Sequence, residues 1–209
     1  ILSAKMAKHF GRTPDSIAKL ELAIRETAHS NVARYVLAKV YRNSGKPFKA
    51  LQILEPIVSS NVDDYRILLE YTLSLLDTGE KYEKCINVLE FCTLYGLTDA
   101  RFISVYGGCC YLNFQFEKAS DIFQRSLQNS IPIDELHVQY FKPKNPLNLN
   151  KNITLKGEVV KIFAGYSIIK SDQYPSIVCP ASKYNGALMA RGLQIQYTLH
   201  FSSKGPVAV

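Results

Sequence analysis

Apolar and small side chains recur every three or four positions through the first 130 residues, and turn signals interrupt them at short intervals. This spacing predicts amphipathic helices. In the clearest unit, Asn31 to Pro56, one helical stripe precedes a turn and another follows it: Leu37, Ala38 and Tyr41, then Ala50, Leu54 and Ile57. Gly45 stands where a helix C-cap belongs, and Pro47 suits the first turn of the next helix. We therefore expect a helix-turn-helix here.

This helix-turn-helix pattern repeats along the chain. Ala50 is followed 35 residues later by the small residue Cys85, and 34 residues after that by Ala119. The companion position runs through Leu54, Leu89 and Phe123. A period of about 34 residues, each containing two helices, is typical of a solenoid. The pattern predicts a helical repeat domain over residues 1–133.

The period changes to two after a Pro- and Asn-rich segment at residues 134–152, which we expect to be a linker packed against both neighbours. Four runs rich in β-formers follow, and Asn185-Gly186 marks a turn between the last two: 155–163, 166–170, 176–179 and 193–199. Several short strands within about 60 residues must close on themselves to hide their edges. We therefore predict a small five-stranded β-barrel over residues 153–209, and a multidomain α + β protein.

Charge is distributed unevenly along the 209 residues. Residues 1–140 contain 16 Lys and Arg against 16 Asp and Glu, whereas residues 141–209 contain nine basic residues against Glu158 and Asp172. The net charge of +7 therefore belongs to the last third. This asymmetry predicts a polyanionic partner for the barrel.

Cysteine and histidine usage argues against catalysis and metal binding. The five cysteines form no Cys-x-x-Cys pair, which indicates a reducing compartment, a cytoplasmic location and free, mostly buried thiols. The four histidines are scattered, and neither a Gly-x-Gly-x-x-Gly, a phosphate-binding loop nor a His-Glu-x-x-His motif occurs. No stretch approaches the roughly 20 apolar residues of a membrane helix. We expect no enzyme activity in this chain, and no cofactor, metal or membrane partner.

The helical pattern resembles the tetratricopeptide repeat through Ala38, Tyr41, Gly45 and Ala50. The resemblance implies a right-handed α-solenoid of helix-turn-helix repeats that binds a protein or peptide on its concave face. The first helix of each pair lines that face. Six residues are expected there by their offset within the repeat: Tyr35, Lys39, Arg42, Glu70, Arg101 and Tyr111.

The strand segments, taken in order, resemble a cold-shock domain, which is an OB-type fold. Five segments carry the resemblance: 155–163, 165–169, 177–182, 192–197 and 205–208. In this family, aromatic rings on the strands stack on unpaired bases while lysines contact the phosphates. The resemblance implies binding of single-stranded RNA or DNA through five residues: Lys156, Lys161, Tyr166, Lys170 and Lys183.

The sequence departs from the cold-shock pattern at the stacking positions. Four residues replace three family aromatic rings and a histidine: Ile162, Ile168, Val178 and Pro180. Tyr166 is then the one stacking ring expected on that face, while Phe163 matches a position more often turned to the core. Loss of three or four rings removes several kcal/mol from single-strand binding. The barrel is accordingly either a salt-sensitive nucleic-acid module or a structural or protein-docking module.

Two functional interpretations follow. The first is an adaptor that binds a protein through its helices and nucleic acid through its barrel. The second is a partner-recruiting or sensor C-terminal region of a larger multidomain protein, with an enzyme domain upstream and the barrel as a protein interface. The absence of an initiator Met and the end at Val209 within an apolar run suggest a fragment of a longer protein.

Overall fold

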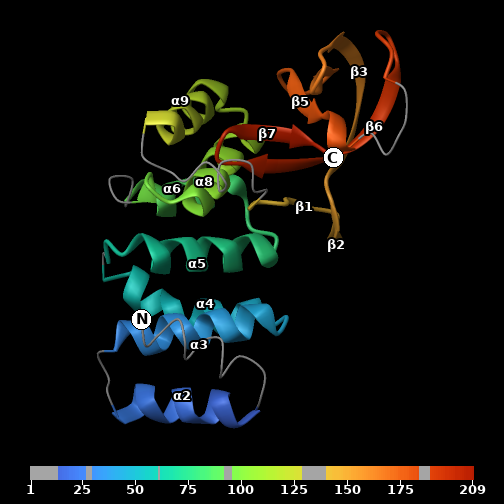
Figure 1. The fold of residues 1–209 in the computed structure, drawn as a ribbon. Coiled ribbons are helices and arrows are strands. Elements are labelled where there is room, and N and C mark those ends of the chain that lie inside the picture. The colour runs from blue at the N-terminus through green and yellow to red at the C-terminus, as the bar shows by residue number, and fades with distance from the viewer. Residues whose placement is uncertain (1–13, 27–29, 61, 92–95, 129–139, 184–188) are drawn as a thin grey trace. The chain divides into compact units, whose positions relative to one another are not determined.

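The computed structural model describes residues 14–26, 30–60, 62–91, 96–128, 140–183 and 189–209. Its contacts divide the chain into two compact units (Figure 1). The first comprises residues 1–80 with 87–92, and the second comprises residues 81–86 with 93–209. The domain boundaries expected near residues 133 and 153 both fall inside the second unit, and they stay a prediction about which segments fold independently.

The described helices follow one another in pairs along the chain. The pairs are α3 (Asn31–Asn43) with α4 (Pro47–Val58), α5 (Tyr65–Asp77) with α6 (Tyr82–Glu90), and α8 (Ala100–Leu112) with α9 (Phe116–Gln128), preceded by α2 (Pro14–Glu26). The first helices begin 34 and then 35 residues apart, and the second helices 35 and then 34 residues apart. The predicted helical repeat array is therefore confirmed.

Each first helix of a pair begins with a side-chain cap. Ser30 accepts a hydrogen bond from the backbone N–H of Ala33, and Asp64 and Asp99 cap α5 and α8 in the same way. These caps satisfy backbone donors that have no partner inside the helix. The recurrence of Ser or Asp at the same place in the period explains why the helices begin there.

The turns inside the three pairs share one backbone geometry. A residue with positive φ follows the first helix of each pair: Gly45 (72°), Gly79 (82°) and Phe114 (60°). The N–H of the next residue then donates to a carbonyl five residues earlier, at 2.9–3.0 Å: Lys46 to Tyr41, Glu80 to Leu75, and Gln115 to Cys110. This is the Schellman pattern, which favours glycine. Phe114 adopts it at a cost of roughly 1–3 kcal/mol.

Five of the strands in the second unit form the predicted barrel. The strands are β3 (Thr154–Ile162), β4 (Tyr166–Ser171), β5 (Ile177–Pro180), β6 (Gln194–Ser202) and β7 (Gly205–Ala208). They close in the order β3-β4-β5-β7-β6, and every pairing is antiparallel except that of β5 with β7. Short alternating strands bury one face of each, and closure leaves no free edge. The turn expected at Asn185-Gly186 lies outside the described residues.

The segment expected to be a linker contains two short strands of its own. These are β1 (Lys144–Asn145) and β2 (Asn148–Asn152), which pair antiparallel. Just before them, Phe141 forms a backbone bridge to Phe201 on β6, and the two rings stack at 5.6 Å between centroids. Phe141 is 5% exposed, so this end of the segment is part of the core.

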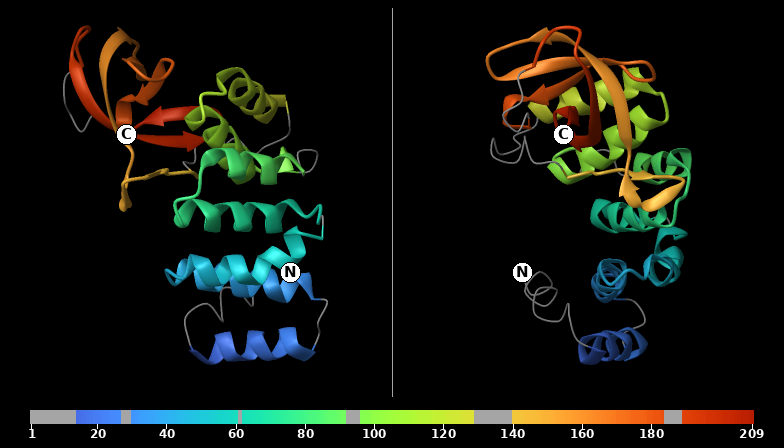
Figure 2. Two further views of the ribbon diagram at one scale, coloured as in Figure 1. Left: turned by 180° about the vertical axis from the view of Figure 1, so that it is seen from behind. Right: turned by 90° about the vertical axis from the view of Figure 1, so that its right-hand side faces the viewer.

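The last helix pair packs on β6 and β7 within the second unit, as the two views of Figure 2 show. Phe201 is fully buried there and stacks on Phe123 of α9 at 6.4 Å. Gly108 of α8 makes this packing close: a Cβ at that position would lie 2.5 Å from the Phe141 ring. Helices α8 and α9 and the barrel therefore share one hydrophobic core.

Candidate functional site

The outer face of strands β3, β4 and β5 carries most of the residues that the sequence singled out for nucleic-acid binding. Its rows follow from the strand register. Lys161 is opposite Ile168, which is opposite Val178 on β5, and Tyr166 is opposite Pro180. Because Ser167 and Ile169 are fully buried and side chains alternate along a strand, these residues point away from the barrel interior.

A bulge in β3 decides which of its side chains join this face. Val159 is opposite Ile169, yet Lys161 is opposite Ile168, so two residues of β3 face one residue of β4. Val159 is fully buried, and strict alternation would place Lys161 and Phe163 inside with it. The extra residue reverses the alternation beyond the bulge. Lys161 and Phe163 therefore face outward.

Phe163 and Tyr166 form an exposed pair of stacked rings. Their centroids lie 4.7 Å apart with 21° between the ring planes, and they are 46% and 39% exposed. The Phe163 N–H donates to the Tyr166 carbonyl at 2.8 Å, which holds the tight β3–β4 connection. The expectation that Phe163 turns to the core is therefore wrong, because the bulge carries it to the surface.

Three large aliphatic side chains of the barrel are also exposed. Ile162, Val178 and Leu193 are each between 38% and 46% exposed. Isolated exposed aliphatic residues are ordinary, but two of these three stand where a cold-shock domain has stacking rings. Of the three, Val178 lies on the outer rows, opposite Ile168, whereas Ile162 is opposite the buried Ser167. The outer face thus carries two rings where the sequence predicted one.

The predicted lysines belong to the same barrel. Lys156, Lys161, Lys170 and Lys183 are all exposed. Lys183 belongs to a short 3₁₀ helix (Ala181–Lys183) that hydrogen-bonds to Gly165 in the β3–β4 connection through the Ala181 N–H, at 2.9 Å. The one acid on these strands, Glu158, is opposite Lys170 and accepts a hydrogen bond from Gln194 at 3.2 Å. The structure therefore gathers the predicted lysines and Tyr166 on one module, and their role stays a prediction.

Residues expected to line the solenoid groove occupy different environments. In the first unit, the Arg42 guanidinium lies 2.5 Å from the Glu70 carboxylate and 3.3 Å from that of Asp77. Glu70 is 2% exposed, and a buried carboxylate needs such a partner. Arg42 and Glu70 thus link α3 to α5, which are first helices of successive pairs. Their charges therefore largely neutralise each other within the fold.

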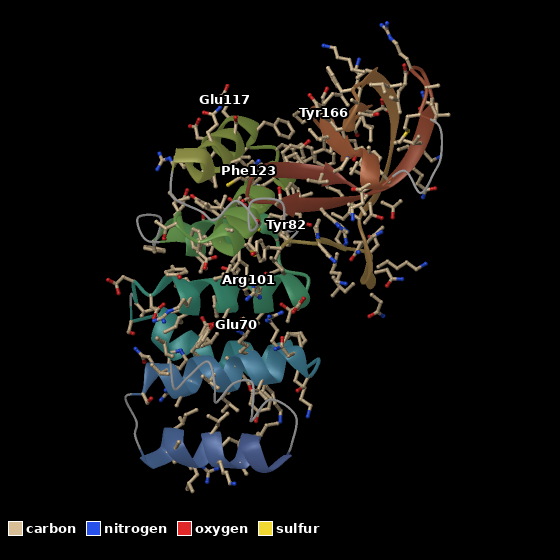
Figure 3. All side chains as sticks on the ribbon, in the orientation of Figure 1. Glu70, Tyr82, Arg101, Glu117, Phe123 and Tyr166 are labelled. Atoms are coloured by element: carbon tan, nitrogen blue, oxygen red, sulfur yellow. The ribbon has the colours of Figure 1, made fainter. Side chains whose placement is uncertain are left out.

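The remaining groove candidates are divided between the two units. Lys39 lies over the Tyr35 ring on α3, with 5.9 Å from Nζ to the ring centroid. Arg101, labelled in Figure 3, is half-buried on α8. Tyr111 is 5% exposed, and its hydroxyl donates to the Pro175 carbonyl at 3.1 Å. Whether these residues bind a partner stays a prediction.

Catalytic chemistry has little support among the described residues. No group of three or more His, Cys, Asp or Glu within them could hold a metal ion. The four described cysteines are free and buried, and burial raises the pKa of the Cys109 thiol well above its usual range. Buried neutral thiols are unreactive. Three histidines (His9, His29, His137) and Cys92 lie outside the described residues.

His200 is the one histidine that the described part of the chain contains. It lies on β6 and is 7% exposed. Burial lowers its pKa to about 4, and the charges of Lys142 and Lys183 act in the same direction. It is therefore neutral near pH 7. No described helix has both the length and the apolar character to cross a membrane.

Comparisons with known proteins bear on the fold alone. No protein-family model and no curated protein matches this sequence. Two solved structures of MamA are similar to it, one of the RS-1 ArsTM double mutant and one of a further mutant. Each has 18% sequence identity and a TM-score of 0.50, and covers 61% of this chain and 72% or 74% of the MamA chain. This likeness supports a helical repeat array.

Proposed function

We propose that the protein is an adaptor, with a barrel that binds single-stranded nucleic acid and helical repeats that bind a protein. The observation that carries the nucleic-acid half is the exposed Phe163–Tyr166 stack on a lysine-rich face. If these rings were buried in the interior, their stacking would only contribute to packing of the core. Rings that leave two fifths of their surface open are available to unpaired bases.

The ring pair supplies stacking energy that the rest of the face lacks. A base stacked on an aromatic side chain contributes about 1–3 kcal/mol. With Phe163 facing outward, the platform has two rings, so a loss of three or four rings is partly offset. The energy is enough for weak binding of a few nucleotides, with lysines adding the electrostatic share.

Strand order supports an OB-type binding face. The barrel has five strands, and the exposed rows lie on its second and third strands, β4 and β5, next to β3. In OB folds this same part of the barrel binds oligonucleotides. The position of Tyr166 and Val178 on these strands is therefore consistent with a strand of nucleic acid crossing them.

Net charge favours a polyanion over a neutral partner. Residues 141–209 carry nine basic side chains against two acids. The single acid on the face, Glu158, is engaged by Gln194 and lies opposite Lys170. We expect affinity to fall as salt rises, because bound phosphates release counterions.

Protein binding is assigned to the helical repeats. Arrays of this kind present an extended surface along their first helices. Tyr35 and Lys39 on α3 are half-buried rather than buried, so part of each side chain remains on the surface of the first unit. They are the strongest candidates there, because Arg42 and Glu70 neutralise each other.

Fluorescence anisotropy with the full chain tests the nucleic-acid half. The probes are labelled single-stranded RNA and DNA of about 12 nucleotides, a length within known OB-fold site sizes. We expect micromolar binding that weakens with salt and is weakened by Lys161→Glu and by Tyr166→Ala. Phe48→Ala is the control, because Phe48 is 68% exposed on α4 of the first unit. Absence of binding even at low salt contradicts the proposal.

A second candidate function rests on the exposed aliphatic side chains of the barrel. Exposed Ile162, Val178 and Leu193 would suit a protein partner better than a base. In that case Val178→Asp abolishes binding of a co-purifying protein while the wild-type chain binds neither RNA nor DNA. Both results are needed, because a nucleic-acid module would also lose affinity when an acid enters its face.

A further inference from the structure

A pocket of about 350 Å³ opens in the second unit, between α9, the β4–β5 connection and β7. Tyr111, Ala119 and Phe123 line its depth and are at most 7% exposed. Phe116, Pro175 and Pro206 complete its apolar lining. Figure 3 labels Phe123 on α9. Its volume is at the lower end of the range for ligand pockets, about 300–1,000 Å³.

One stripe of helix α9 forms a whole wall of this pocket. The lining residues follow the helical spacing i, i+3, i+4, i+7 and i+8: Phe116, Ala119, Ser120, Phe123 and Gln124. Such a stripe normally faces a core. Here its inner members, Ala119 and Phe123, are buried while Ser120 and Gln124 are exposed. The pocket is therefore apolar at depth and polar at its mouth.

The opposite wall excludes recognition by strand addition. Pro206 lies in β7 at the pocket and has no backbone N–H to donate. Strand β7 is also paired on both of its sides, with β5 and with β6. A bound segment cannot extend the sheet through this strand. The affinity of a bound segment has to come from a side chain that it inserts between the Phe116 and Phe123 rings of the pocket.

Charge sets the second requirement on the ligand. Lys204 is the single charged residue among those that line the pocket in the described part of the chain. The wider charge of this region also attracts a negatively charged ligand, because residues 141–209 carry nine basic residues and two acids. An apolar group carried next to negative charge therefore complements the pocket, and a basic segment does not.

We propose that this pocket binds a short acidic peptide segment of a partner protein, which inserts one large apolar side chain between Phe116 and Phe123 and directs a carboxylate toward Lys204. The site shares no residue with the ring pair of Phe163 and Tyr166. It does include Tyr111, which the repeat offset places on a partner-binding surface. The pocket and the ring pair are therefore separate sites.

The test uses the full chain and a labelled peptide of about nine residues, which spans at most roughly 30 Å when extended. The peptide carries one central Trp between pairs of Asp. Two comparison peptides replace Trp with Ala, or every Asp with Lys. We expect the acidic Trp peptide to bind and to shift the backbone NMR signals of Ser120 and Lys204, and both comparison peptides to bind at least about tenfold more weakly.

Two tryptophan variants of helix α9 show whether a bulky ring weakens binding only when it stands at the pocket. Ser120→Trp places a bulky ring at the pocket mouth and should weaken the acidic peptide about tenfold or more. Asp121→Trp places the same ring on the next residue of α9, outside the lining, and removes an acid, so it should not weaken the acidic peptide. Lys204→Glu should weaken the acidic peptide and strengthen the Lys peptide. Circular dichroism checks that all three variants stay folded.

Three results would overturn the assignment. The first is no binding of the acidic Trp peptide, with no shift of the Ser120 and Lys204 signals. The second is equal binding by Ser120→Trp and the wild-type chain, which places the peptide elsewhere. The third is binding of indole alone as tightly as the peptide, which assigns the pocket to small aromatic molecules instead.

Discussion

Phe163 and Tyr166 are bound to each other twice, through a backbone hydrogen bond of 2.8 Å and through rings stacked at 4.7 Å between centroids. The hydrogen bond fixes the β3–β4 connection, and the stack fixes both side chains on the outside of the barrel. Two exposed rings held in one geometry lose little rotamer freedom when a ligand binds, and such preorganisation favours affinity.

Salt dependence should report the phosphate contacts of individual lysines. Lys161→Ala and Lys170→Ala should each make the negative slope of log K against log salt less steep by about 0.7, the value for one contact to a single strand. Lys39→Ala on α3 is the control and should leave the slope unchanged. A titration of labelled single-stranded RNA across salt concentrations measures this. Equal slopes for all three variants would remove these two lysines from the binding face.

Removing Arg42 should destabilise the first unit strongly. Arg42→Ala leaves the Glu70 carboxylate, 2% exposed, without its ion pair, which costs about 3–5 kcal/mol in the free energy of unfolding. Arg66→Ala is the matched control, because Arg66 is 60% exposed in its pair with Asp64. It should cost at most about 1 kcal/mol. Urea unfolding measures both.

The double variant Arg42→Leu with Glu70→Leu tests whether the lost stability comes from the unpaired, buried Glu70 carboxylate. It removes both charges, so most of the lost stability should return. If the single Arg42→Ala variant unfolds no more easily than the Arg66→Ala control, the pair is not a structural element of the first unit.

His200 should make the second unit less stable in mild acid. Its pKa of about 4 in the folded chain lies below the usual value of about 6.5. The unfolded chain therefore binds more protons between these values, and stability falls as the pH drops from about 6.5 toward 4. The loss should reach roughly 1–3 kcal/mol. Urea unfolding at pH 7 and pH 5 should show a smaller difference for His200→Gln than for the wild-type chain.

Gly108 should tolerate no side chain. A Cβ there would lie 2.5 Å from the Phe141 ring and 3.1 Å from Phe201. Gly108→Ala should therefore cost about 1–3 kcal/mol through overpacking. Gly165→Ala is the control, because nothing lies within 4 Å of its Cβ position. Equal thermal unfolding midpoints for the two variants would contradict the close packing of α8 on Phe141 and Phe201.

The helical repeats could be predicted from sequence because their signals are local. Gly45 and Gly79 mark turns by their backbone freedom, and small residues at Ala50, Cys85 and Ala119 mark the close helix contacts. These features recur at a fixed spacing, so each repeat supports the next. Phe114 breaks the glycine pattern without breaking the turn. Its ring stacks on Tyr174 at 5.6 Å, a contact between segments that no local pattern reveals.

The outward position of Phe163 could not be predicted from alternation. Residues 159–163 are Val-Val-Lys-Ile-Phe, and nothing in this run marks the extra residue between Val159 and Lys161. A bulge becomes visible only through the pairing of β3 with β4. The same limit applied to Arg42 and Glu70. The repeat offset places both on first helices, but only the structure shows that they pair.

The most direct test of the account is the affinity of labelled single-stranded RNA for four versions of this chain at low salt: wild type, Phe163→Ala, Tyr166→Ala and Phe48→Ala. The account predicts that each ring variant weakens binding by about 5- to 150-fold, equivalent to about 1–3 kcal/mol per stacked base. It also predicts that Phe48→Ala matches the wild type. Equal affinities for all four proteins would contradict a stacking role for Phe163 and Tyr166.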